Sequence, residues 1–267
     1  MVKKGIILAG GTATRLFPLT ATTSKQLLPV YDRQMIFYPL NTLIKAGIRD
    51  ILVIVSPEHS GQFLNLLGSI FKSYGVHLYF EVQKVPRGLA EAFILGENFI
   101  DNNSVALILG DNIFEDDFAK AVKSFKSGGQ IFAKKVADPE RLGVVKFDSQ
   151  KRAVQIVEKP KEWISDYAVP GFYIYDKNVV AIAKKIKPSD RGEIEITAVN
   201  NEYLKNGKLK VGLIKGEWLD AGTFDSLLEA GYIVKTKKLY KNFHPLVDKA
   251  IADFNEELKG ICKKKLF

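Results

Sequence analysis

Four charged side chains in this 267-residue sequence could act on phosphates: two cations, Arg15 and Lys25, and two carboxylates, Asp111 and Asp220. A guanidinium is a planar fork that suits phosphate oxygens, and an ammonium is a movable point charge. Carboxylates suit a hard cation such as Mg²⁺, which in turn binds phosphates. Transfer of a phosphoryl-bearing group needs positioning and charge neutralisation rather than a strong base, so these residue types fit that chemistry.

The two cations follow a glycine pair, Gly10-Gly11, which itself follows the apolar run 5–9. Such a run predicts a buried parallel strand, although a buried helix segment gives the same pattern. Glycines let backbone N–H groups face an anion without Cβ obstruction. A dinucleotide fingerprint, G-x-G-x-x-G, is excluded because residues 10–15 read GGTATR. A P-loop is excluded because no Gly-Lys-Ser/Thr closes the loop.

Length and composition fit one large α/β domain, or a domain with a subdomain, at 29.8 kDa. Cys262 is the only cysteine, which excludes a disulfide scaffold. The sequence shows no secretory leader and no long uncharged apolar run, so we expect a cytoplasmic protein without a membrane partner. Of the formal net charge of +9, five charges come from the segment after Val234, with nine lysines and four acidic residues. The mildly basic remainder does not favour a nucleic-acid polymer as partner.

The spacing of apolar residues predicts alternating strands and helices over about the first 118 residues. Strands are expected at residues 51–55, 78–82 and 105–109, and helices at about 40–46, 63–71 and 89–96. This alternation predicts an α/β fold with a doubly wound, mostly parallel sheet, in which ligands collect at the carboxyl ends of the strands.

After residue 118 the pattern changes to short strands separated by turn residues, which predicts a second lobe continuous with the sheet. These strands are expected at residues 130–136, 144–147, 153–157 and 171–175, with later strands at 210–214 and 218–220 and helices at 179–186, 194–204 and 224–234. The last segment has apolar residues at helical spacing: Leu246, Val247, Ala250, Ile251, Phe254 and Leu258. We expect an amphipathic helix with a basic end that packs on the body or on another subunit.

Several motifs together resemble the sugar nucleotidyltransferases, and among them most closely the glucose-1-phosphate thymidylyltransferases. Residues 10–30 resemble G-G-x-G-T-R-L-x-P-L-T…S-K-Q-L-L-P-V, residues 109–114 match L-G-D-N-I-F, and residues 218–223 are close to W-L-D-T-G-T. The resemblance covers roughly residues 5–234. It implies a Rossmann-like nucleotidyltransferase fold that uses Mg²⁺ to transfer a nucleotidyl group from dTTP, or UTP, to glucose 1-phosphate, releasing pyrophosphate.

The resemblance also implies roles for particular residues. Arg15 would bind the leaving pyrophosphate and Lys25 would span the phosphates, while Asp111 and Asp220 would hold the metal. The expected nucleotide-binding residues are Leu8, Gly10, Gly11, Thr12, Ala13, Gln26, Gln83, Gly88 and Asp111. The amide of Gln83 offers a donor and an acceptor to the imide edge of thymine or uracil. Gly88 would let the base approach closely.

For the sugar phosphate, the resemblance implies a second set of residues: Gly143, Glu158, Lys159, Val169 and Tyr173. Glu158 and Lys159 belong to an E-K-P triplet in which the glutamate binds sugar hydroxyls and the lysine binds the phosphate. Residues 191–197, RGEIEIT, resemble R-G-E-x-E-I-T and are expected to help close the sugar pocket. We expect the nucleotidyltransferase domain to span residues 1–235. Its nucleotide-binding half would take about 1–129 and its sugar-binding lobe about 130–225, with a basic helical tail at 236–267.

Four positions depart from the family motifs: Ala13, Gln34, Ala198 and Ala221. Ala13 and Ala198 motivate an alternative, a catalytically silent binding or regulatory homologue. The intact set of cations and carboxylates argues against silence. At Ala13 we expect an ordinary negative φ, with the turn made by the glycines before it. The tail differs from that of the longer family members, so we expect a homo-oligomer with weak or absent feedback by a dTDP-linked product.

Overall fold

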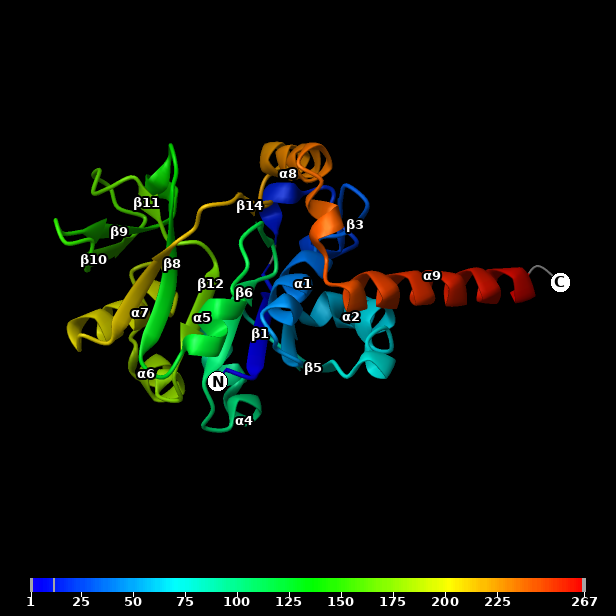
Figure 1. Cartoon of the computed structure of the whole chain (residues 1–267), viewed down its shortest axis with the longest axis horizontal. Helices are drawn as coiled ribbons and strands as arrows, with labels where there is room; N and C mark the ends of the chain where they lie inside the picture. The colour runs from blue at the N-terminus through cyan, green and yellow to red at the C-terminus, as the bar shows by residue number, and fades with distance from the viewer. Residues whose placement is uncertain (1, 12, 266–267) are drawn as a thin grey trace.

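The computed structural model describes residues 2–11 and 13–265, and the side chains of these residues except 258 and 260–265. In this part a ten-stranded sheet has the order β10-β9-β11-β8-β12-β6-β1-β4-β5, with β13 beside β8 (Figure 1). Its strands are β1 (Lys4–Ala9), β4 (Asp50–Val55), β5 (His77–Val82), β6 (Val105–Leu109), β8 (Gly129–Lys135), β9 (Gly143–Phe147), β10 (Ala153–Glu158), β11 (Tyr167–Ala168), β12 (Phe172–Tyr175) and β13 (Leu209–Leu213).

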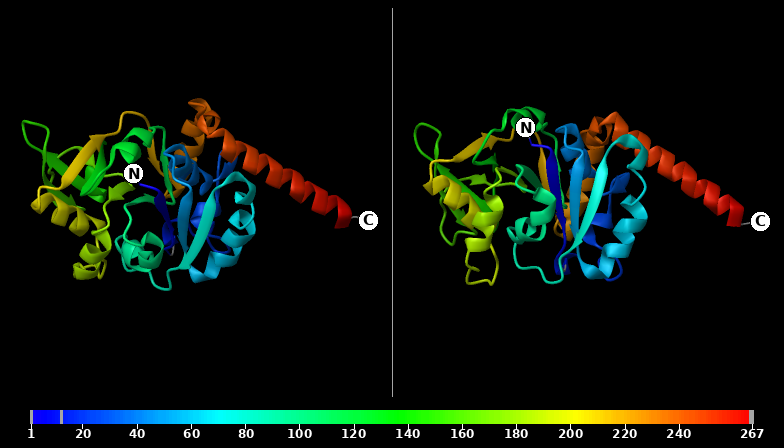
Figure 2. Two further views of the ribbon diagram at one scale, coloured as in Figure 1. Left: turned by 60° about the horizontal axis from the view of Figure 1, so that its bottom comes forward. Right: turned by 90° about the horizontal axis from the view of Figure 1, so that it is seen from below.

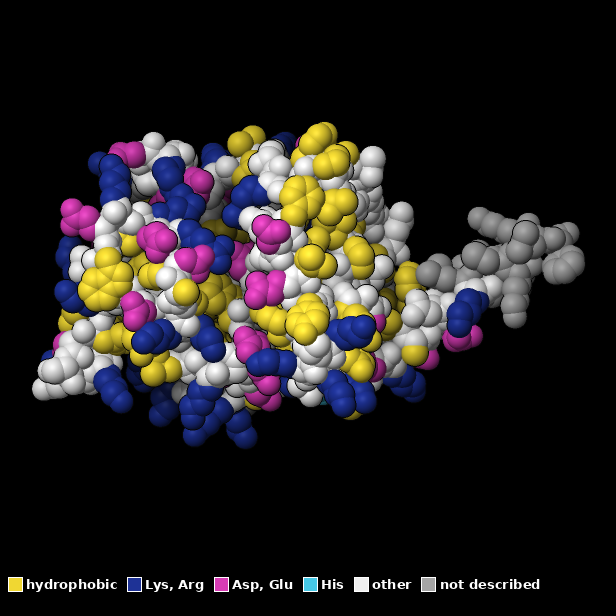
Figure 3. Space-filling view, turned by 90° about the horizontal axis from the view of Figure 1, so that it is seen from above, with side chains coloured by type: hydrophobic (Ala, Val, Ile, Leu, Met, Phe, Trp, Pro, Cys, Tyr) yellow, Lys and Arg dark blue, Asp and Glu magenta, His cyan; other side chains and the backbone are white. Residues whose placement is uncertain are grey.

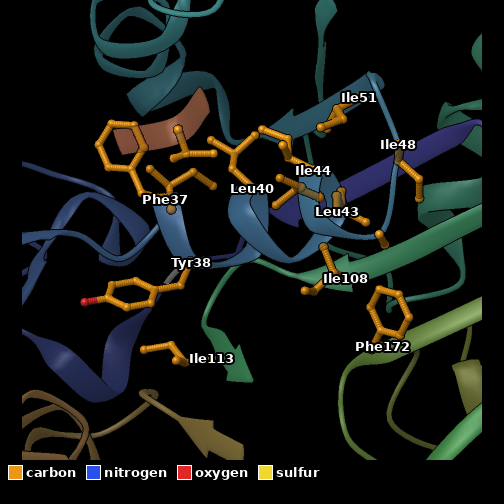
Figure 4. Packing of buried hydrophobic residues seen from close by; sticks show 14 of the residues in the cluster. Phe37, Tyr38, Leu40, Leu43, Ile44, Ile48, Ile51, Ile108, Ile113 and Phe172 are labelled. Carbon is orange, nitrogen blue, oxygen red and sulfur yellow. The ribbon is translucent and has the colours of Figure 1, made fainter. Parts of the chain in front are cut away.

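The first part of the sheet, β6-β1-β4-β5, is entirely parallel, as the alternation of strands and helices predicts. Strands β1, β4 and β6 are mostly apolar and buried because helices cover both faces, whereas the edge strand β5 alternates exposed and half-buried residues. One face carries α1 (Phe37–Lys45) and α2 (Ser60–Leu67), and the other carries α3 (Glu91–Leu95) and α4 (Glu97–Ile100). Figure 4 shows Leu43 and Ile44 of α1 packed among Ile51 and Ile108 of the sheet. The predicted doubly wound arrangement is therefore confirmed.

The sheet continues into a mixed half through β12, which runs antiparallel to β6. The β9–β10 hairpin and β11 extend it further, and a turn over residues 148–151 connects the two strands of that hairpin. Two helices of this half, α6 (Val179–Lys185) and α7 (Ile196–Lys205), pack on the same face as α3 and α4. Because the strands are hydrogen-bonded without a break, both halves share one scaffold.

A separate two-stranded ribbon joins segments that are far apart in the sequence. It pairs β7 (Asn112–Phe114) with β14 (Trp218–Asp220) in antiparallel register, so that Asp220 lies opposite Asn112. The remaining elements are the β2–β3 hairpin (Pro29–Val30 and Arg33–Gln34), α5 (Ala119–Ser124), α8 (Phe224–Thr236) and short 3₁₀ turns at Thr14–Leu16, Lys25–Leu27, Pro57–His59, Lys72–Tyr74, Pro139–Arg141 and Leu239–Asn242.

Most expected elements are present, and the errors lie at their ends. The helix expected over 63–71 ends at Leu67, and Ile70 and Phe71 are buried from a turn instead. The helix around Leu40 begins at Phe37, with Pro39 in its first turn, where the missing N–H costs nothing. The apolar spacing over 89–96 covers two short helices that meet at Gly96. Apolar spacing indicates which residues are buried, and residues of a buried turn can show the same spacing as those of a helix.

The tail forms α9 (Pro245–Lys265), which starts on the body and then projects away from it (Figures 1 and 2). Val247 and Ala250 are buried, and Leu246, Ile251 and Phe254 are half-buried against α1 and its neighbours. The expected packing of the tail is thus confirmed up to Phe254; Leu258 lies outside the described side chains. No helix in the described chain is both long and apolar enough to cross a bilayer.

Arg33 of β3 attaches the start of this tail to the body. Its guanidinium lies 4.0 Å from the ring centroid of Phe243 and donates to Asp248 Oδ1 at 2.9 Å. We predict that Arg33→Ala lowers the free energy of unfolding by about 2 kcal/mol, because a cation–π contact and a charged hydrogen bond are lost.

The same variant should be cut faster by chymotrypsin at Phe254. Arg152→Ala is the control, because Arg152 pairs with Asp148 in the distant β9–β10 hairpin. This control should change neither the free energy of unfolding nor the rate of cutting at Phe254. Equal cutting rates for Arg33→Ala and the parent protein would contradict this anchoring role.

Candidate active site

A cleft of about 510 Å³ opens where the carboxyl ends of the central strands meet the second half of the sheet. Figure 3 looks onto this end of the molecule, where the surface is hollowed and basic and acidic side chains gather. The expected site residues that line the cleft are Arg15, Lys25, Asp111, Gly143, Glu158, Lys159, Val169, Tyr173 and Asp220. The structure therefore brings together the residues expected for phosphate, metal and sugar.

A second pocket of about 230 Å³ lies against the ends of β4 and β5. Gly11 and Gln83 line it, with Pro57, Lys84 and Pro86 around them. The other expected nucleotide residues do not line either pocket: Leu8, Gly10, Ala13, Gln26 and Gly88. Thr12 lies outside the described residues. Some of the residues expected to bind the nucleotide therefore line a pocket, and the others lie behind its walls.

The β7–β14 ribbon places Asp111 and Asp220 side by side. Asp111 immediately precedes β7, Asp220 ends β14, and the N–H of Ala221 donates to the carbonyl of Asp111 at 3.2 Å. Burial tends to raise the pKa of Asp111, but the Lys25 ammonium and the Asn112 amide hold it below its usual range. Burial and the neighbouring Asp111 charge raise the pKa of Asp220 to about 6.

This pair fits a divalent cation. Two adjacent carboxylates repel each other in a buried site, and burial together with this repulsion raises the pKa of Asp220. No cluster of three or more His, Cys, Asp and Glu suited to a metal occurs in the part of the chain that the structure describes. A hard ion held by two carboxylates takes its other ligands from substrate phosphates and water. The donor set therefore suits an ion that binds together with a nucleotide.

The two cations reach the carboxylates from the loop after β1. Lys25 forms an ion pair with Asp111, from a short 3₁₀ turn. Arg15 lies beside Asp220: a Cβ added at Gly222 would be 2.9 Å from Arg15 Nη2 and 3.2 Å from Asp220 Oδ1. The glycine in residues 218–223 thus leaves room for the guanidinium, a role the sequence did not reveal.

Ala13 has a left-handed backbone, with φ of 47° and ψ of 34°, so the expectation of an ordinary negative φ was wrong. Its carbonyl accepts bonds from Leu16 N and Thr20 Oγ1, both at 3.1 Å. These bonds fix the turn that begins the Arg15 segment. Glycine would adopt this conformation freely, whereas alanine adopts it with strain.

Close neighbours explain why glycine stands at positions 10 and 88. A Cβ at Gly10 would lie 2.5 Å from Gln83 Oε1, and one at Gly88 would lie 2.5 Å from the carbonyl of Ile194. Gly88, with φ of 103°, is thus required by the backbone at Ile194, a different reason from the expected approach of a base. Leu8 and Gln26 are buried behind the loop. The Oε1 of Gln26 accepts a hydrogen bond from Ser24 Oγ, the residue before Lys25.

In the mixed half of the sheet, Glu158 is held by two partners. Its Oε2 accepts from Thr197 Oγ1 at 2.6 Å, and its Oε1 lies 3.7 Å from Arg191 Nη2. Lys159 takes a left-handed φ of 43°, which turns the chain directly after Glu158. Burial and the charge of Glu158 raise the pKa of Tyr173, so its phenol stays neutral and keeps its hydrogen-bond donor. The backbone strain at Lys159 is of a kind that often marks a functional position.

Sequence reasoning gave no role to three residues that line the cleft, Asn112, Arg141 and Trp218, or to Gly222 beside it. Asn112 directly follows Asp111 and donates to its Oδ1 at 3.0 Å. Its own Oδ1 accepts from Trp218 Nε1 at 2.7 Å. Thr197 belongs to the segment expected to close the sugar pocket. Position inside a motif was the available signal for most of them.

Comparison with known proteins agrees with this geometry. The sequence profile of the nucleotidyl transferase family matches residues 4–237, and this chain belongs to that family. It is 51% identical over 247 residues to a glucose-1-phosphate thymidylyltransferase from Neisseria meningitidis, covering 90% of this chain and 85% of the relative. It is 53% identical over 241 residues to one from Mycolicibacterium smegmatis, covering 88% and 83%.

Solved structures of nucleotidyltransferases are similar to this one. A Bacillus anthracis protein, described as a candidate glucose-1-phosphate thymidylyltransferase and crystallised with sucrose, superposes with a TM-score of 0.82 at 45% identity, covering 86% of this chain and 94% of that one. A UDP-glucose pyrophosphorylase with UDP-glucose gives 0.77 at 25% identity, covering 89% and 100%. The expected family and Rossmann-like fold are confirmed, and the protein is a nucleotidyltransferase. The family generally uses a divalent metal.

The strained turn at Ala13 gives a stability prediction. Ala13→Gly should raise the free energy of unfolding by about 0.5–1 kcal/mol, because glycine adopts a positive φ without the penalty that alanine incurs. Ala21→Gly, in the same loop at an ordinary φ, is the matched control and should lower it. Chemical unfolding of the three proteins tests this; a loss of stability in Ala13→Gly would contradict the strained conformation.

The raised pKa of Asp220 predicts a pH dependence of stability in chelator-treated protein. The folded carboxyl binds its proton more tightly than the unfolded one, so this contribution to stability is present at low pH and is lost as pH rises from about 4 to 6. The loss should be roughly 2–3 kcal/mol for a shift of this size. Asp220→Asn removes the contribution; parallel pH curves for both proteins would contradict it.

Proposed function

We propose that this protein transfers a thymidylyl group from dTTP to α-D-glucose 1-phosphate with Mg²⁺, giving dTDP-glucose and pyrophosphate. The observation that carries the proposal is the meeting of Asp111, Asp220, Arg15 and Lys25 with Glu158 in one cleft. The names of relatives at 51–53% identity support the choice of nucleotide and sugar. We also propose that residues 1–129 form the nucleotide-binding half, 130–225 the sugar lobe and 1–235 the whole catalytic domain.

In the proposed reaction a sugar phosphate oxygen attacks the α-phosphorus of the nucleotide and pyrophosphate leaves. The attacking oxygen is already anionic, so no base is needed. Arg15 neutralises charge on the leaving pyrophosphate, and Lys25 moves from Asp111 onto the phosphates. Glu158 orients the sugar through its hydroxyls and Lys159 binds its phosphate. A bound Mg²⁺, held by the two carboxylates, would supply electrostatic stabilisation of the phosphates.

A UTP-using enzyme, or one for another sugar, is the nearest alternative, since the amide of Gln83 suits uracil and thymine equally. The structural likeness to a UDP-glucose pyrophosphorylase motivates it, at 25% identity. A catalytically silent homologue is disfavoured by the complete set of cations and carboxylates. A homo-oligomer stays a prediction, to be measured by the mass of the protein in solution.

The deciding experiment is a panel of nucleoside triphosphates against sugar 1-phosphates, with Mg²⁺, read by pyrophosphate release. We expect dTTP with glucose 1-phosphate to give the highest kcat/KM. Asp111→Asn and Asp220→Asn should each lower kcat by orders of magnitude while remaining folded. Preference for another pair would replace the substrate assignment, and near-parental turnover by both folded variants would remove the metal assignment.

Lys25 should matter more for turnover than for binding, because negative charge on the phosphates gathers in the transition state. We predict that Lys25→Ala lowers kcat by about 100-fold or more, comparable to loss of one electrostatic donor. The KM for dTTP should change much less. Steady-state kinetics measure both, and a change in KM alone would make Lys25 a binding residue.

A further inference from the structure

A buried carboxylate lies behind the base pocket and has no part in the proposed chemistry. Glu91 is 2% exposed, and its Oε2 accepts from Gln83 Nε2 at 2.8 Å and from the backbone N–H of Arg87 at 3.1 Å. Its Oε1 accepts from Arg87 Nε at 2.7 Å. Among the described residues, every hydrogen-bond partner of this carboxylate is an N–H donor.

This contact fixes which way the Gln83 amide faces. An ionised carboxylate only accepts hydrogen bonds, so the reverse orientation would place the Gln83 oxygen against a carboxylate oxygen. The bonded orientation leaves Gln83 Oε1 over Gly10, where an added Cβ would be only 2.5 Å from it. Gln83 itself is 4% exposed, and it lines the pocket beside Gly11 and Pro86. Gln83 therefore presents its Oε1 to the pocket as a hydrogen-bond acceptor in a fixed position.

We infer that Glu91 is a positioning residue that sets nucleobase selectivity by holding the Gln83 amide in this one orientation. The inference rests on the proposed function. A base with a ring N–H beside a carbonyl, such as thymine or uracil, can donate to Gln83 Oε1 and accept from the second N–H of the amide. Cytosine has an acceptor at the same ring position, which faces the fixed oxygen unfavourably. If the amide could flip, cytosine would match it.

The conservative variant separates this role from simple packing. In Glu91→Gln, the new amide can still place its oxygen toward Gln83 and the Arg87 N–H, because the opposite orientation would set its NH₂ against that buried donor. The Arg87 side chain is mostly exposed and can swing away. Glu91→Met keeps much of the volume but removes the acceptor, so the Gln83 amide becomes free to turn.

The test compares dTTP with 5-methyl-dCTP, two nucleotides that differ only at the edge facing Gln83. The purified enzyme, Glu91→Met, Glu91→Gln and Gln83→Ala are assayed by pyrophosphate release with glucose 1-phosphate. In Glu91→Met we expect the dTTP to 5-methyl-dCTP ratio of kcat/KM to fall about tenfold, the effect of one hydrogen bond. The change should lie mainly in KM, and Glu91→Gln should keep the parental ratio.

The double variant Gln83→Ala/Glu91→Met completes the cycle. If Glu91 acts through Gln83, Glu91→Met should have no further effect on the ratio once the amide is gone. An unchanged ratio in folded, active Glu91→Met would overturn the inference, as would an equal change in the Gln83→Ala background. Failure of the proposed function gives a different result, since the parent enzyme itself would then not turn over dTTP.

Discussion

The pairing of β7 with β14 is the constraint on which the rest of the site depends. It brings Asp111 and Asp220, 109 residues apart in the chain, to adjacent ends of one ribbon. Two carboxylates in a buried place are unfavourable unless cations offset them. The loop after β1 supplies those cations, while burial and the Asp111 charge raise the pKa of Asp220. Two adjacent carboxylates at this place are suited to receive a divalent ion.

The two halves of the cleft obtain their precision from one continuous sheet. β12 joins the parallel strands to the mixed half of the sheet, so Glu158 is held in a fixed position relative to Asp111. Backbone hydrogen bonds from Ile194 N to Arg87 O, at 2.6 Å, and from Ala90 N to Ile194 O join the segment after β5 to the segment before α7. Substrate positioning therefore rests on rigid elements, where small displacements would cost much of the rate.

Two residues with a left-handed backbone lie next to side chains that line the cleft. Ala13 comes two residues before Arg15, and Lys159 directly follows Glu158. The surrounding bonds enforce these conformations, at Ala13 through the bonds to its carbonyl and at Lys159 through its N–H to Leu142 O at 2.9 Å. The departure from glycine at Ala13 is thus tolerated without loss of the turn.

The sequence by itself determined the order of strands and helices, because continuous apolar runs such as 51–55 and 105–109 mark strands buried on both faces, and apolar residues at helical spacing mark the helices between them. It also supplied the motif residues, since their types follow from phosphate and metal chemistry. It could not supply the ends of buried helices, the sign of φ at Ala13, the room that Gly222 leaves for Arg15, or the orientation of Gln83 by Glu91. Each of these depends on atoms brought close by chain segments distant in sequence or by loop bonds, and only the tertiary structure places such atoms together.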